Sequence, residues 1–139
     1  MNMALLLYTV EVGPRGGLQL RLSGGGIPPA YIVRAAGAVE EIAVAGLPLG
    51  AVPDAEYRIR TAHLSTGDTV LLMSDGLPER LSPENEQLGY EAVERWLRLE
   101  LDRQWPAATI VERLLDLGAA WSQEGVADDD ETFVVMKVL

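Results

Sequence analysis

The sequence contains no cysteine, a single histidine (His63) and few basic residues. Without cysteine, the chain has no disulfide, no thiolate metal ligand and no cysteine nucleophile. A single histidine excludes a metal site built from several histidines, and no nucleophile-elbow motif accompanies His63 to suggest a serine hydrolase. The 11 Lys and Arg against 21 Asp and Glu give a formal net charge of −10. Such an acidic chain is not expected to bind nucleic acid or an anionic membrane.

Long hydrophobic runs are also absent. The apolar stretch at residues 3–10 is much shorter than the roughly 20 residues of a membrane helix. No Lys or Arg precedes this stretch and Glu11 follows it, so a signal peptide is not expected. We therefore expect a cytoplasmic protein.

The length and composition are those of one globular domain. The chain has 139 residues, of which 48% are hydrophobic and 23% are charged. A chain of this size can bury a substantial core and is too short for two ordinary domains. We predict a single domain over residues 1–139.

The first two thirds of the sequence have the pattern of strands separated by glycine and proline. Alternating leucines at residues 18–22 predict a strand with one buried face, and the pattern breaks at Ser23. Residues 31–34 and 39–44 are typical of a hairpin. Residues 69–73 form a continuous apolar run, which predicts a central strand covered on both faces.

The hydrophobic period then changes to that of helices. We predict one helix within residues 86–104 and a second that begins at Pro106 and ends at Gly125. A β-branched run at residues 132–138 predicts a final strand. The order predicts an α+β fold in which largely antiparallel sheets pack with helices.

The pair Asp75-Gly76 directly follows the predicted central strand. A carboxylate at the end of a buried strand is held rigidly, and glycine lets the backbone turn sharply or approach a ligand. This arrangement suits a metal ligand. An ordinary strand-ending turn has the same pattern and is the more common case.

A run of four acidic residues, Asp128 to Glu131, precedes the last predicted strand. Adjacent carboxylates repel one another unless a cation relieves the repulsion, although such a run is often only a solvated loop. This run and Asp75 each adjoin an apolar strand, so both can converge at one edge of a sheet. A metal held there would be Mg²⁺ or Mn²⁺ rather than zinc, because the ligands are oxygens.

Through these residues and several short motifs, the sequence resembles the SpoIIE/RsbU-like branch of the metal-dependent serine/threonine protein phosphatases, the PPM family. Five short motifs occur in the order typical of that family. They are the glycine-rich turn ending in Pro28-Pro29, residues 46–50 (Gly-Leu-Pro-Leu-Gly), Leu64 followed by Gly67-Asp68, residues 74–79 (Ser-Asp-Gly-Leu-Pro-Glu) and residues 129–132 (Asp-Asp-Glu-Thr).

The resemblance implies two antiparallel sheets packed between helices, with a pair of Mg²⁺ or Mn²⁺ ions at one end. In this family the ions lower the pKa of a bridging water, which attacks the phosphorus of a phosphoserine or phosphothreonine. By motif match, Asp75 and Asp129 would be the catalytic metal ligands, with Gly76, Asp130 and Thr132 in supporting positions. The implied substrate is a phosphoprotein such as an anti-sigma-factor antagonist.

The sequence also departs from the family pattern. Ile27 stands where the family often has histidine, and the family's N-terminal metal-binding Gly-Asp motifs are not found. We therefore expect the C-terminal portion of a phosphatase domain that is inactive by itself. A second interpretation stays open, in which the chain is a non-catalytic module that binds a partner or forms a homodimer through uncovered sheet surface.

Overall fold

The computed structural model describes residues 3–14, 16–123 and 129–139. These residues form seven strands and two helices, whose bounds follow in chain order. They are β1 (Leu5–Val12), β2 (Leu18–Gly25), β3 (Ala30–Val33), β4 (Val39–Ile42), β5 (Arg60–Leu64), β6 (Thr69–Met73), α1 (Tyr90–Leu99), α2 (Ala107–Trp121) and β7 (Phe133–Lys137).

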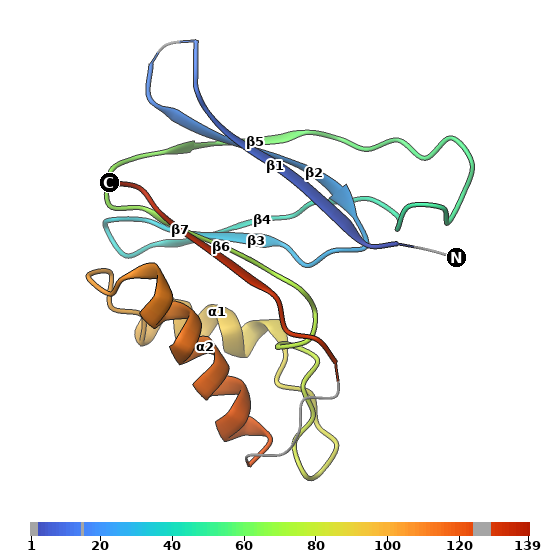
Figure 1. Cartoon of the computed structure of the whole chain (residues 1–139), viewed down its shortest axis with the longest axis vertical. Helices are drawn as coiled ribbons and strands as arrows, with labels where there is room; N and C mark the ends of the chain where they lie inside the picture. Colours follow the sequence, from blue (N-terminus) through green and yellow to red (C-terminus); the bar gives the residue numbers. More distant parts are fainter. Residues whose placement is uncertain (1–2, 15, 124–128) are drawn as a thin grey trace.

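The elements are arranged in three layers (Figure 1). One sheet has the strand order β1-β2-β5 and the other has the order β4-β3-β6-β7, and every pairing is antiparallel. Both helices lie against the four-stranded sheet, on its face away from the other sheet. The predicted α+β class with antiparallel sheets and packed helices is confirmed.

Two hydrophobic cores hold the layers together, and β6 contributes to both. Its Val70 and Leu72 pack between the two sheets, whereas Leu71 and Met73 pack against the helices. All five residues of β6 are buried, because successive side chains of a strand point to opposite faces and both faces are covered here. The predicted central strand is therefore confirmed.

Strand β2 is longer than the sequence pattern indicates, since it continues past Ser23 to Gly25. Two glycines make this extension compatible with close neighbours. A Cβ on Gly24 would lie 2.1 Å from the Leu5 carbonyl oxygen, and one on Gly25 would lie 2.1 Å from the Leu47 carbonyl oxygen. The glycines that indicate a break in the sequence are needed for close backbone packing instead.

The first helix is shorter than predicted at both ends, because α1 covers Tyr90–Leu99 rather than residues 86–104. Gly89 adopts φ 84° and ψ 153°, a conformation that only glycine occupies readily, and this residue ends the preceding loop. Pro106 is the N-cap of α2, and this helix ends at Trp121. The predicted end at Gly125 lies outside the described residues. Neither described helix is long and apolar enough to cross a lipid bilayer.

Candidate metal centre

Two acidic segments meet where β6 ends and β7 begins. These strands are antiparallel neighbours, and Met73 at the end of β6 pairs with Phe133 at the start of β7. Asp75 therefore emerges from the sheet beside residues 129–132. The sheet topology brings together two segments that are more than fifty residues apart in the sequence.

Ser74 ties the two segments together through its backbone and its side chain. Its N–H donates to the Thr132 carbonyl oxygen over 3.0 Å. Its Oγ accepts a hydrogen bond from the Thr132 N–H over 2.9 Å and donates to the Asp130 carbonyl oxygen over 3.0 Å. These contacts hold the backbone of the second segment in register with the residue that precedes Asp75.

Gly76 permits the close approach of the second segment. A Cβ at position 76 would lie 2.5 Å from the Asp130 carbonyl oxygen and 3.2 Å from Glu131 Cγ. Any other residue would push the acidic segment away from Asp75. This glycine therefore serves close packing between two backbone segments, which differs from the sharp turn or ligand approach expected from the sequence.

The acidic side chains differ in their exposure. Asp75 is half-buried, whereas Asp129 and Asp130 are exposed. The Asp130 N–H donates to Asp129 Oδ1 over 2.7 Å, which orients that carboxylate next to its own backbone. Asp128, the first acid of the run, lies outside the described residues.

A pocket of about 340 Å³ opens beside Asp75. It lies between β1, the loop that follows β2, and the adjoining ends of β6 and β7. Asp75, Ser74 and Thr132 supply its polar lining, and Ile27 and Tyr8 are among its apolar lining. Of the predicted site residues, Asp75 and Thr132 line this pocket, and Asp129 and Asp130 lie in the segment packed against Gly76.

The donor atoms suit a hard cation in type but are few in number. Asp75 and Asp129 offer carboxylate oxygens, which Mg²⁺ and Mn²⁺ prefer, whereas these ions take about six ligands. Within residues 3–14, 16–123 and 129–139, no group of three or more His, Asp or Glu side chains is placed to hold a metal. The described residues therefore fit part of such a centre and do not complete it.

Tyr90, the first residue of α1, belongs to the surroundings of Asp75 and was not identified from the sequence. Burial raises the pKa of Tyr90, and the negative charges of Glu79 and Asp75 raise it further. The phenol therefore stays protonated at neutral pH as a neutral neighbour of Asp75. A tyrosine at the start of an amphipathic helix gives no signal of this position.

A buried ion pair that the sequence did not predict joins Arg80 to Glu131, the last acidic residue of the second segment. Arg80 donates through a terminal guanidinium N–H to Glu131 Oε1 over 2.9 Å, and the two side chains are 9% and 7% exposed. Arg80 also donates from Nε to Ser122 Oγ over 3.0 Å. In the sequence, Arg80 is simply an arginine close to Asp75. Glu131 lies 51 residues away, so no local pattern predicts that the two form a pair.

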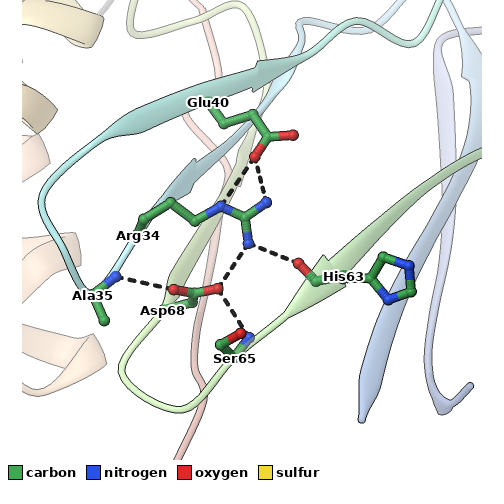
Figure 2. A network of polar contacts seen from close by, with 6 residues as sticks. All are labelled: Arg34, Ala35, Glu40, His63, Ser65 and Asp68. Carbon is green, nitrogen blue, oxygen red and sulfur yellow. Dashed lines mark hydrogen bonds and ion pairs between the residues drawn. The ribbon is translucent and has the colours of Figure 1, made fainter. Parts of the chain in front are cut away.

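The opposite end of β6 carries a second aspartate, Asp68, which has a different environment (Figure 2). It is 2% exposed and accepts hydrogen bonds from the N–H groups of Ala35 and Ser65 and from the Arg34 guanidinium. Arg34 also pairs with Glu40. This motif residue thus joins the β3–β4 and β5–β6 connections, and it lies at the end of β6 away from Asp75.

A family model described as Stage II sporulation protein E (SpoIIE) matches residues 5–139. The chain belongs to the SpoIIE family. The resemblance inferred from the motifs is thereby confirmed, and phosphatase domains of this family depend on Mn²⁺ or Mg²⁺. Comparison with curated protein sequences gives no match.

Solved phosphatase domains share the fold of this SpoIIE-family chain. The SpoIIE phosphatase domain from Bacillus subtilis, presoaked in Mn, matches 96% of the chain with a TM-score of 0.70 and 20% identity. The SiaA-PP2C domain of Pseudomonas aeruginosa matches 86% with a TM-score of 0.73 and 25% identity. A Mycobacterium tuberculosis structure of RsbU and RsbW domains matches 86% with a TM-score of 0.58 and 24% identity.

The chain spans about half the length of the first two of these solved structures and about a third of the Mycobacterium tuberculosis structure. The match covers 56% of the Bacillus subtilis chain and 46% of the Pseudomonas aeruginosa chain.

Proposed function

We propose that this chain contributes part of the metal centre of a protein serine/threonine phosphatase. The packing of the Asp75 segment against residues 129–132 carries this proposal. That contact places two acidic segments side by side at the edge of a buried sheet and next to a pocket. Membership of a phosphatase family supports the same reaction class.

In this proposal, Asp75 and Asp129 are the metal ligands, and three neighbours support them. Gly76 lets the two backbones approach, and Asp130 and Thr132 fix the second segment through Ser74. Bound Mn²⁺ or Mg²⁺ would supply an acidified water and neutralise charge on the phosphoryl group. The residues of the chain hold and orient that centre, and the pocket beside Asp75 leaves room for a phosphorylated side chain.

We further propose that residues 1–139 form the C-terminal portion of such a domain and are inactive alone. The structural match covers only about half the length of the two solved domains, which supports this assignment. So does the small number of carboxylates at the centre within the described part of the chain. With water in place of missing ligands, the chain would bind one ion weakly and would not hold two in the geometry that phosphoryl transfer needs.

The proposed substrate is a regulatory phosphoprotein of the anti-sigma-factor-antagonist type, in the cytoplasm. The structural match to a protein that contains RsbU and RsbW domains supports this choice of regulatory setting.

Phosphate release from a phosphoserine protein in the presence of Mn²⁺ tests the proposal. The chain would be compared with the natural protein, including any residues encoded upstream of Met1. We expect no turnover by the chain and metal-dependent turnover by the longer protein. Asp75→Asn and Asp129→Asn should each reduce that turnover at least 100-fold, or about 2.7 kcal/mol, because each removes a charged ligand.

Asp116→Asn is the matched control, since Asp116 is 70% exposed on α2 and pairs only at the surface with Arg113. Its turnover should equal that of the wild type. Retained turnover in both ligand variants would show that Asp75 and Asp129 do not hold the metal.

A non-catalytic module that self-associates is the second candidate, and the edge strands favour it. Among the described strands, β1 pairs only with β2, and β7 pairs only with β6. Tyr8, Val10 and Val12 share a face of the sheet with the buried leucines of β2, yet are 43%, 43% and 73% exposed. A stable dimer that shows no turnover, with or without residues encoded upstream of Met1, would favour this candidate over the enzyme.

A further inference from the structure

We infer that Arg80 is a positioning residue that holds the second acidic segment in place beside Asp75 before any metal binds. The inference rests on the proposed metal centre, because it concerns how that centre is kept in shape. Arg80 itself is not placed as a ligand, and it acts through Glu131.

The ion pair between Arg80 and Glu131 is almost fully removed from solvent. The donor–acceptor distance is 2.9 Å, and the two side chains are 9% and 7% exposed. A buried pair of this kind is costly to break from one side, since the remaining charge is left uncompensated. Glu131 is therefore held firmly, and with it the adjoining residues Asp130 and Thr132.

Arg80 is itself anchored from two directions. Its carbonyl oxygen accepts the Leu88 N–H over 3.0 Å, and its Nε donates to Ser122 Oγ at the end of α2. The Ser122 hydroxyl in turn donates to the Gly118 carbonyl oxygen over 3.2 Å. A Cβ on Gly118 would approach Arg80 Cδ to 3.2 Å, so α2 passes directly over the arginine stem. The guanidinium is thus fixed by the helix layer rather than by the acidic segment alone.

The charges explain why such an anchor is needed. Asp75, Asp129, Asp130 and Glu131 lie in two segments that pack against each other at Ser74 and Gly76, and like charges repel. Ser74 joins the segments only by neutral hydrogen bonds. Arg80 adds the positive charge that offsets part of the repulsion while leaving Asp75 and Asp129 available for an ion. Preorganised ligands of this kind raise metal affinity, because less rearrangement accompanies binding.

Amide hydrogen exchange of the metal-free chain tests the inference, with Arg80→Met as the main variant. The Thr132 amide is the probe, since its N–H bonds to Ser74 Oγ across the two segments. We expect the Thr132 amide to exchange at least tenfold faster in Arg80→Met, with unchanged exchange at amides in the centre of β3 and β6. Arg80→Lys, which keeps the charge, should restore part of the protection.

Arg98→Met is the matched control. Arg98 pairs with Glu94 on α1, and its side chain is 56% exposed, so its loss should leave Thr132 exchange unchanged. If Arg80→Met does not fold, Glu131→Gln removes the same ion pair with little change of shape and should give the same local increase. Unchanged Thr132 exchange, or an equal increase at every amide, would overturn the positioning role.

Mn²⁺ binding separates this inference from the proposed function. Titration of MnCl₂, followed by the electron paramagnetic resonance signal of the free ion, should show at least tenfold weaker binding by Arg80→Met than by the wild type. Equal affinity would overturn the role in metal binding. If the wild-type chain binds no Mn²⁺, the proposal that it binds one ion weakly by itself fails, and the exchange experiment still decides whether Arg80 positions the segment.

Discussion

At the scale of single residues, β6 shows how two aspartates in similar sequence contexts acquire different roles. Asp68 precedes the strand and is buried with three hydrogen-bond donors around it, whereas Asp75 follows the strand and lines a pocket. Burial raises the pKa of Asp68, but the hydrogen bonds from Ser65, Ala35 and Arg34 lower it more, so the net pKa lies below its usual value. Asp68 is therefore a charged structural residue, whereas Asp75 lines a pocket.

We predict that Asp68→Asn lowers the free energy of unfolding by about 2 kcal/mol at pH 7, because charge-assisted hydrogen bonds are lost. A lowered pKa in the folded state stabilises the protein above the ordinary aspartate pKa. This contribution disappears as the pH falls through the folded-state value. Urea unfolding at pH 7 and at about pH 3 should therefore show a smaller difference between variant and wild type at the acidic pH.

Asp116→Asn is again the control, with no expected change at either pH, because its carboxylate is exposed on α2. An equally large effect of Asp68→Asn at both pH values would contradict the charged role of Asp68.

At the scale of secondary-structure elements, α1 shows a local conformation overriding a helical pattern. The helix predicted from the sequence begins before Tyr90, but the N–H of Leu88 bonds to the Arg80 carbonyl oxygen and the N–H of Gly89 bonds to the Pro78 carbonyl oxygen. These contacts keep the residues before α1 in a loop packed on the Asp75 segment. The start of the helix is thus set by tertiary hydrogen bonds and by the backbone freedom of Gly89.

We predict that Gly89→Ala destabilises the chain by about 1–3 kcal/mol, because φ 84° with ψ 153° is strained for any residue with a Cβ. The space around this position is open, so steric collision with neighbours does not contribute. Urea unfolding followed by circular dichroism measures the effect. Glu91→Ala, in the exposed first turn of α1, serves as the control, and equal stability of the Gly89 variant would argue against backbone strain at this cap.

At the scale of the whole molecule, charge and exposed apolar surface act in opposite directions. The net charge of −10 repels a second copy, whereas the uncovered inward face of β1 favours association. Salt screens the repulsion and leaves hydrophobic contact intact. The oligomeric state should therefore depend on ionic strength.

We predict that light scattering after size exclusion shows a larger dimer fraction at high salt than at low salt. Val10→Lys should remove this dimer, because it places a charge on the exposed apolar face of β1. Val52→Lys is the matched control, since Val52 is 45% exposed in a loop and Val10 is 43% exposed. A monomer at every salt concentration would rule out association through β1.

The strand pattern of the sequence was largely sufficient to predict the fold, because the burial of strand faces gives the hydrophobic residues a regular spacing in the sequence. The continuous apolar run at β6 and the alternation in β2 follow directly from which faces are covered. Boundaries were less accurate, since β2 extends through Gly24 and Gly25 and α1 begins four residues late. In both places contacts with distant segments, rather than local pattern, decide where the element ends.

The amino-acid sequence was enough to predict the layered α+β architecture and to show the family motifs and the absence of cysteine and of multiple histidines. Each of these depends on residue type and on spacing along the chain, which can be read directly from the linear sequence. Tertiary packing was needed to show that Gly76 faces the Asp130 backbone and that Arg80 pairs with Glu131. Those relations arise when β7 pairs with β6 and α2 packs over the Asp75 segment, and no local spacing encodes contacts between segments fifty residues apart.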